Sequence, residues 1–163
     1  MIHKILSRSQ INHVIGDLKK KGQKIVFTNG CFDLLHVGHV RYLQEAASLG
    51  DCLIIGLNDD RSVREIKGPH RPLISEAQRA EVLAALACVG YIVLFHEADP
   101  FKLIEAIKPD VLVKGADWSL DRIIGADLVH SYGGEVHRVE LVPLISTSEI
   151  IQRIISRYSE PTV

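Results

Sequence analysis

Two histidines three residues apart, His36 and His39, have the type and spacing that most clearly suggest chemistry in this chain. They flank Gly38 in a His-x-Gly-His sequence, which follows an apolar run and residues 28–33, Thr-Asn-Gly-Cys-Phe-Asp. Backbone N–H groups in a strand-to-helix turn and the N-terminus of a helix bind anionic phosphate. We therefore predict that both rings face a bound phosphate. Because a helix N-terminus disfavours protonation, His39 would act as a neutral N–H donor.

The same segment allows other interpretations. A zinc site built from Cys31, His36 and His39 lacks an evident fourth ligand, and the Cys31 thiol also suggests a covalent nucleophile. Asp33 is equally compatible with a residue that only stabilises the turn. The chain contains neither the G-x-x-x-x-G-K-[ST] loop nor the G-x-G-x-x-G loop that bind phosphates in other proteins.

Three further segments suit the binding of a nucleotide. Lys67 and Arg71 occupy a loop with glycine and proline, and Arg79 lies one turn into the next helix. These cations either clamp phosphate groups or are solvated surface charge. Trp118, the single tryptophan, either belongs to the core or stacks on a nucleobase. At 146–147, hydroxyl side chains cap the last helix, whose N-terminus is compatible with phosphate binding.

Strand and helix patterns alternate along the chain and place these segments together. The strands are expected at 24–28, 52–57, 91–95, 111–114 and 134–141, and the main helices at 8–21, 40–49, 75–87, 100–107, 123–131 and 148–157. This order predicts an α/β fold with a single doubly wound, Rossmann-like parallel sheet and helices on both faces. Because such sheets bind ligands beyond the carboxyl ends of their strands, we expect one shared site. Residues 1–163 are predicted to form one domain, with a helical segment 1–22 packed on it.

Composition narrows the class of protein. With 163 residues and 47% hydrophobic residues, the chain suits one soluble globular domain. A net charge of −1 argues against nucleic acid as a partner, and no apolar run approaches the roughly 20 residues needed to span a membrane. Three cysteines without a disulfide or metal spacing, and an N-terminus without a secretory signal, favour a reducing, cytoplasmic location.

The motif from Thr28 to His39 resembles the nucleotidyltransferase superfamily, which includes cytidylyltransferases and adenylyltransferases. Further matches, among them Asn58-Asp59-Asp60, Lys67-Gly68, 109–115 and 133–136, make the chain similar to the D-glycero-β-D-manno-heptose 1-phosphate adenylyltransferases. This resemblance implies the nucleotidyltransferase fold, ATP and a sugar 1-phosphate as substrates, and Mg²⁺ bridging the phosphates. It also implies a homo-oligomer that makes ADP-heptose for lipopolysaccharide core synthesis. Because no sugar-kinase sequence accompanies these motifs, we expect a stand-alone form.

The resemblance also implies roles for individual residues. The catalytic residues would be His36, His39 and Lys67. The nucleotide would be bound by Thr28, Asn29, Gly30, Cys31, Phe32, Asp33, Gly38, Arg79, Gly115, Asp117, Trp118, Ser146 and Thr147. The acceptor would be bound by Asp33, Asn58, Lys67 and Arg71, and no protein ligand to the metal is assigned. Two alternatives remain: a cytidylyltransferase acting on a small phosphorylated alcohol such as glycerol 3-phosphate, and a non-catalytic nucleotide-binding protein.

Overall fold

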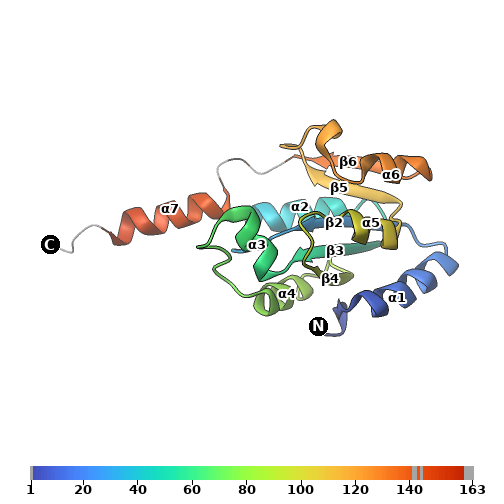
Figure 1. The fold of residues 1–163 in the computed structure, drawn as a ribbon, viewed down its shortest axis with the longest axis horizontal. Coiled ribbons are helices and arrows are strands. Elements are labelled where there is room, and N and C mark those ends of the chain that lie inside the picture. The colour runs from blue at the N-terminus through green and yellow to red at the C-terminus, as the bar shows by residue number, and fades with distance from the viewer. Residues whose placement is uncertain (1, 141–142, 144, 160–163) are drawn as a thin grey trace.

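The computed structural model describes residues 2–140, 143 and 145–159. Within them, parallel strands form one sheet in the order β1-β4-β3-β2-β5-β6 (Figure 1). The predicted α/β class and the parallel, doubly wound sheet are therefore confirmed. The strands are β1 (Ile5–Leu6), β2 (Ile25–Gly30), β3 (Cys52–Asn58), β4 (Tyr91–Phe95), β5 (Val111–Gly115) and β6 (Glu135–Val139).

Helices cover both faces of this sheet because successive strand residues point to opposite sides. On one side, Ile25 and Phe27 of β2 pack with apolar residues of α1, α5 and α6; on the other, Val26 packs with α2 and α4. The helices are α1 (Arg8–Lys20), α2 (Val37–Ala47), α3 (Asp60–Lys67), α4 (Glu76–Ala84), α5 (Phe101–Ile107), α6 (Ala126–Ser131) and α7 (Thr147–Tyr158), with 3-10 turns η1 (Ile2–Lys4) and η2 (Leu120–Arg122).

Most predicted elements are present, and their boundaries differ for local reasons. The capping box of Ser7 and Gln10 begins α1 as expected. The helix predicted over 123–131 begins only at Ala126, as α6, because its N-cap Gly125 has a φ of 88° and cannot continue a right-handed helix. The two-residue strand β1 was not predicted, and α4 ends three residues earlier than expected. The extended segment 134–141 corresponds to β6, and its last residue, 141, lies outside the described residues.

Strand β2 lies at the point where the sheet changes direction. It pairs with β3 over six residues, from Ile25 with Cys52 to Gly30 with Leu57. Its ladder with β5, a stretch described throughout, pairs only Val26 with Val111 and Phe27 with Leu112. The two strands therefore part toward their carboxyl ends, and a crevice opens there, as expected at a topological switch point.

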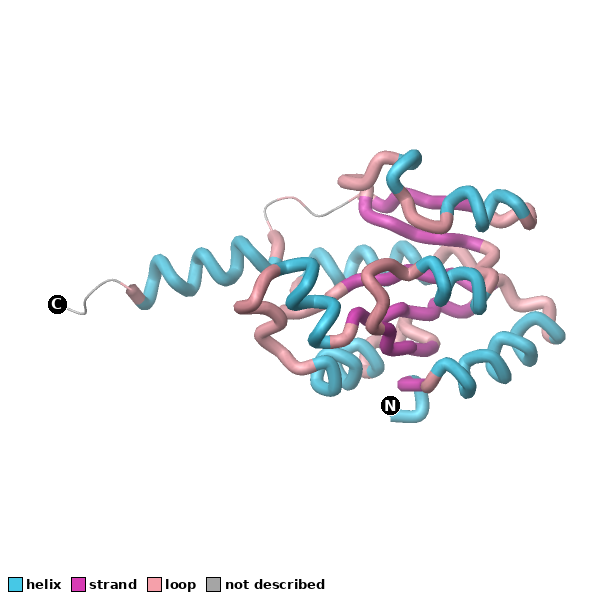
Figure 2. The backbone as a smooth tube through the Cα atoms, viewed as in Figure 1, coloured by secondary structure: helices cyan, strands magenta, loops and turns pink. Residues whose placement is uncertain are grey.

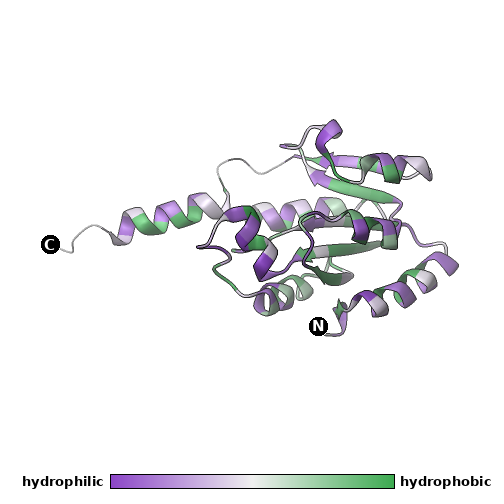
Figure 3. Ribbon diagram, viewed as in Figure 1, coloured by the Kyte–Doolittle hydropathy of each residue, from purple (hydrophilic) through white to green (hydrophobic). Residues whose placement is uncertain are grey.

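The last helix, α7, extends away from the sheet (Figures 1 and 2). None of its residues is buried, and hydrophobic and hydrophilic stretches alternate along it (Figure 3). Only its N-terminal end lies at the carboxyl edge of the sheet, where residues 145–148 line a cavity. Among the described residues, no helix has both the length and the apolar character that a membrane crossing requires.

Candidate active site

A cavity of about 550 Å³ lies at the carboxyl edge of the strands. It is lined by the turn after β2, the start of α2, the end of α3, the segment after β5 and the start of α7. All but two of the residues predicted for the site are among those that line it: Asn29, Gly30, Cys31, Phe32, Asp33, His36, Gly38, His39, Asn58, Lys67, Arg71, Gly115, Asp117, Trp118, Ser146 and Thr147. The cavity therefore lies at the strand ends, where the sequence predicts one shared site.

The two histidines at the start of α2 both line this cavity. The rings of His36 and His39 stack with centroids 3.8 Å apart and planes 24° apart. Both Nδ1 atoms are buried and have no hydrogen-bond partner within the described part of the chain. Burial, together with the neighbouring His36, lowers the pKa of His39 to about 4, and burial also lowers the pKa of His36. Both rings are therefore neutral near pH 7, and each retains an unused polar nitrogen.

Local backbone features hold this pair in place. His36 is the N-cap of α2 and makes no side-chain cap hydrogen bond, so the first N–H groups of α2 are not satisfied by it. A Cβ atom at Gly38 would lie 2.9 Å from two atoms of the His36 ring, so only glycine leaves room for the stacked arrangement. Phe32 has a φ of 44°, in the left-handed region, and its ring packs edge-on against His39. A strained residue next to polar groups is typical of a functional site.

Asp33 and Arg71 both line the cavity, and their side chains form an ion pair. The Asp33 carboxylate accepts hydrogen bonds from Arg71 Nε and from the backbone N–H groups of Leu73 (2.9 Å) and Ile74 (3.0 Å). Burial would raise the pKa of Asp33, but these hydrogen bonds outweigh it and lower the pKa below its usual value. The geometry thus matches the turn-stabilising interpretation of Asp33, which fixes the loop after α3. Contact of either residue with substrate stays a prediction.

Arg79 lies behind the cavity wall. Its side chain is fully buried and donates to the carbonyl oxygens of Ile74 (3.0 Å) and Cys31 and to the Asp60 carboxylate (2.8 Å). The arrangement does not support the predicted role of Arg79 as a mobile phosphate clamp, because its donors already have protein partners. Helical position indicated where Arg79 lies along α4, but not that a carboxylate from α3 would bind it.

Thr28 is the second predicted residue that does not line the cavity. Its side chain is buried, and its Oγ1 lies 2.7 Å from the hydroxyl of Tyr42, which donates to the Val113 carbonyl oxygen at 3.1 Å. This chain of hydrogen bonds joins α2 to β2 and β5 beneath the site. The prediction that Thr28 contacts the nucleotide therefore has no support from its position.

The remaining predicted side chains face the cavity. Trp118 is 46% exposed, which excludes the interpretation of Trp118 as a core residue. Lys67 ends α3 at the rim and is exposed, whereas Asn58 is buried and donates to Ser62 Oγ at 3.2 Å. Ser146 caps α7 as predicted, since its Oγ accepts from the backbone N–H of Glu149 at 3.2 Å.

Sequence reasoning missed one charged residue of the cavity wall, Lys114. Its Nζ donates to Asn29 Oδ1 and lies 5.9 Å from the centroid of the Trp118 ring. Burial lowers the pKa of Lys114 to about 8, although the negative charge of Asp117 and the Cys31 thiol oppose this. A signal was available, because a lysine just before Gly115 interrupts an otherwise apolar strand.

The structure also bears on the zinc and nucleophile interpretations. In the described residues, no group of three or more His, Cys, Asp or Glu side chains could hold a metal ion. Burial raises the pKa of the Cys31 thiol, although Lys67, Arg79 and Arg71 partly oppose this. A thiol with a raised pKa is a poor nucleophile near neutral pH.

The chain is similar to a known protein family and to curated proteins. The family described as cytidylyltransferase-like matches residues 27–153. The bifunctional protein HldE of Syntrophotalea carbinolica is 53% identical over 157 residues, and that of Geobacter metallireducens is 54% identical over 157. In both cases the match covers 96% of this chain and 32% of the relative, so the chain spans about a third of the length of these curated relatives.

Two solved structures share the fold. The lipopolysaccharide core biosynthesis protein from Thermoplasma volcanium is 31% identical with a TM-score of 0.60, and the match covers 74% of this chain and 98% of that one. The pantoate-beta-alanine ligase from Francisella tularensis, in a complex with beta-gamma ATP and beta-alanine, has a TM-score of 0.63. At 18% identity, with 94% of this chain and 77% of the ligase covered, the ligase supports the fold alone.

Proposed function

This chain belongs to the cytidylyltransferase-like family, and from that premise we propose that it transfers a nucleotidyl group from a nucleoside triphosphate to a phosphate-bearing acceptor. More specifically, we propose transfer of AMP from ATP to D-glycero-β-D-manno-heptose 1-phosphate, which yields ADP-heptose and pyrophosphate for lipopolysaccharide core synthesis. The identity to HldE proteins and to a lipopolysaccharide core biosynthesis protein supports this acceptor.

The observation that carries the proposal is the pair of stacked, neutral histidines at the start of α2. Two imidazolium rings 3.8 Å apart would repel each other, whereas neutral rings can each offer one N–H donor. Together with the N-terminus of α2, these donors suit an anion whose charge is spread over several oxygen atoms. A triphosphate has this charge distribution.

The reaction needs alignment more than proton transfer. An oxygen of the acceptor phosphate attacks the α-phosphorus of ATP in line, and the bond to the β-phosphate oxygen breaks to release pyrophosphate. A phosphate monoester with a second pKa of about 6 is already largely ionised near pH 7, so no general base is required. We assign His36, His39 and Lys67 to the developing charge on the pyrophosphate, and Ser146 with Thr147 to the positioning of the phosphates.

We propose that a divalent cation, Mg²⁺ in particular, accompanies ATP. The cavity suits a cation held by substrate phosphates rather than by a protein cage, because Asp33 is already bound to Arg71 and two backbone N–H groups. When bound, the cation would neutralise charge on the phosphates. We further propose a homo-oligomer in a reducing, cytoplasmic setting; the three free cysteines support the reducing environment.

The test is pyrophosphate release with ATP or CTP and Mg²⁺, with and without the heptose 1-phosphate, and with glycerol 3-phosphate as a second acceptor. Release that requires both ATP and the heptose phosphate is the expected result. Turnover with CTP and glycerol 3-phosphate instead would keep the mechanism and replace the substrates. Binding of ATP without turnover for any pair would favour the non-catalytic alternative.

A further inference from the structure

The Lys114 side chain is half-buried, and the protein satisfies its ammonium group only in part. An ammonium has three N–H donors, and the described residues supply one acceptor, Asn29 Oδ1. No carboxylate of the described chain lies within ion-pair distance of Nζ. Because Lys114 lines the cavity, its remaining donors are available to a molecule bound there.

The other basic residues around the cavity differ from Lys114 in this respect. Arg71 is bound to Asp33, and Arg79 is bound to Asp60. Lys67 is exposed and solvated at the rim. Burying a charge without a counter-ion costs considerable free energy, so such a group is expected where a ligand supplies the opposite charge.

The position of Lys114 fits a substrate contact as well. Its Nζ reaches across from β5 to Asn29 on β2, at the point where these two strands have parted. The hydrogen bond to Asn29 and the Trp118 ring, whose centroid lies 5.9 Å away, restrict where the ammonium can lie. A side chain held in this way is already positioned for a ligand in the crevice.

We propose that Lys114 is a substrate-binding residue whose ammonium donates to a phosphate oxygen of one of the two substrates, ATP or the sugar 1-phosphate. The identity of these two molecules rests on the function proposed above. Binding of the anion would supply the counter-ion that the free protein lacks. Lys114 would thereby hold the phosphate group in the crevice between β2 and β5.

The titration of Lys114 gives an independent measurement. The charged or titratable groups around it are Asp117, the Cys31 thiol and Arg138, its register partner on β6. Since burial lowers the pKa of Lys114 to about 8, the ammonium is charged at pH 7 and loses its proton as the pH rises to 9. The KM of the substrate that it binds is therefore expected to rise over this range. Lys114→Arg keeps its charge and should show a flatter profile.

Direct binding tests the proposal without requiring turnover. Trp118 is the only tryptophan, so its fluorescence can report titrations with ATP, with the heptose 1-phosphate and with uncharged adenosine. We expect Lys114→Met to weaken one of the two phosphate ligands by about ten- to a hundred-fold, the usual effect of losing a hydrogen bond to a charged group, and to leave adenosine unchanged. Lys102→Met, a change on the exposed surface of α5, is the matched control.

A second readout separates binding from a structural role. Methionine removes a half-buried charge that has no ion-pair partner among the described residues and fills similar space, so the melting temperature of ligand-free Lys114→Met should equal or exceed that of the wild type. A lower melting temperature with a parallel loss of adenosine affinity would overturn the proposal, as would wild-type affinity for both phosphate ligands. If the wild type binds ATP but releases no pyrophosphate with any acceptor, the proposed function fails, and the contrast in ATP binding still decides the role of Lys114.

Discussion

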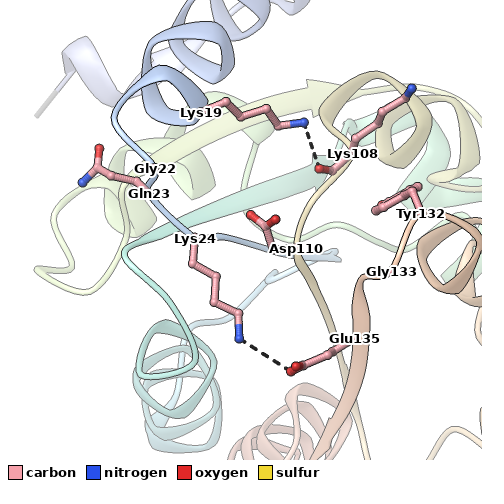
Figure 4. Close-up of a pocket in the computed structure, with 9 residues that line it drawn as sticks. All are labelled: Lys19, Gly22, Gln23, Lys24, Lys108, Asp110, Tyr132, Gly133 and Glu135. Atoms are coloured by element: carbon pink, nitrogen blue, oxygen red, sulfur yellow. Dashed lines mark hydrogen bonds and ion pairs between the residues drawn. The ribbon is translucent and has the colours of Figure 1, made fainter.

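A hollow lies at each end of the sheet, and the two hollows are similar in size. In one of them the polar side chains have protein partners, whereas in the other several polar atoms lack them among the described residues. The one at the amino ends of the strands measures about 600 Å³ and is shown in Figure 4; the one at the carboxyl ends measures about 550 Å³. In the first, Lys24 pairs with Glu135 at 3.6 Å, Lys19 donates to the Lys108 carbonyl oxygen at 3.1 Å, and Asp110 accepts from a backbone N–H. These partners are all supplied by the protein.

The hollow at the carboxyl ends leaves comparable groups without protein partners. The Nδ1 atoms of His36 and His39 are buried and unpaired within the described chain. Lys114 has one acceptor for three donors and is less exposed to water than Lys19 and Lys24. Polar atoms of this kind are costly unless a ligand or water completes them. The candidate site therefore differs from the other hollow in its unsatisfied hydrogen-bonding groups and not in its volume.

The largest effect is expected at Arg79, whose buried side chain lies behind the wall of the candidate site. Arg79→Met leaves Asp60 and two backbone carbonyl oxygens without their donor, so we expect a loss on the order of 3 kcal/mol in the free energy of unfolding, measured with urea. Arg61→Met, which breaks an exposed pair with Glu65, is the control and should cost less than about 1 kcal/mol. Unchanged stability with a large loss of ATP affinity would instead restore the clamp role.

The next effect separates the two hollows by activity. His39→Ala removes a donor for the developing charge, and turnover is expected to fall by about 10²-fold or more while the fold is retained. Tyr132→Phe removes a hydroxyl that donates to the Pro109 carbonyl oxygen in the opposite hollow, and turnover should be unchanged. Steady-state pyrophosphate release measures both. Near-normal turnover of His39→Ala would exclude this residue from the mechanism.

A smaller effect concerns the dependence of stability on pH. Since hydrogen bonding lowers the pKa of Asp33 in the folded state, its stabilising effect is complete above the ordinary carboxylate pKa, near 4, and is lost as the pH falls further. Asp33→Asn should be about 1–2 kcal/mol less stable than wild type at pH 7. Urea unfolding at pH 7, 5, 4 and 3 should show this gap narrowing toward the acid end. A gap that stays constant would argue against Asp33 as the titrating group.

The smallest effect is expected at the satisfied hollow. Lys24 and Glu135 are both well exposed, so Lys24→Ala should change the free energy of unfolding by less than about 1 kcal/mol. The KM for ATP and turnover should match the wild type, because the described residues that line this hollow do not line the other cavity. An altered KM would contradict the comparison, because it would show that the hollow at the amino ends affects substrate binding at the carboxyl ends.

The location of the site could be predicted from the sequence because it depends on topology. Gly30, Asn58 and Gly115 each end a parallel strand, and the carboxyl ends of parallel strands share one edge whatever the side chains do. The capping box of Ser7 and Gln10 was predictable for a similar reason, since both partners lie within one helical turn.

Features that depend on distant partners could not be predicted in this way. The strand β1 has two residues, and it is a strand only because Ile5 and Leu6 pair with Ile92 and Val93 of β4. Arg79 was expected in the cavity, but the Asp60 carboxylate on another helix holds it in the interior. Neither contact can be read from a sequence pattern, because each joins residues from separate secondary-structure elements.

The short ladder between β2 and β5 has a mechanical consequence. Two residue pairs join these strands, whereas six join β2 to β3 and five join β5 to β6, so the sheet inside its edge strand β1 is least connected along the line that opens into the candidate site. Substrates in the crevice would contact both sides of this seam and hold β5 and β6 against the rest of the sheet. Slower amide hydrogen exchange in β5 and β6 is then expected when ATP binds, including at residues that no ligand touches.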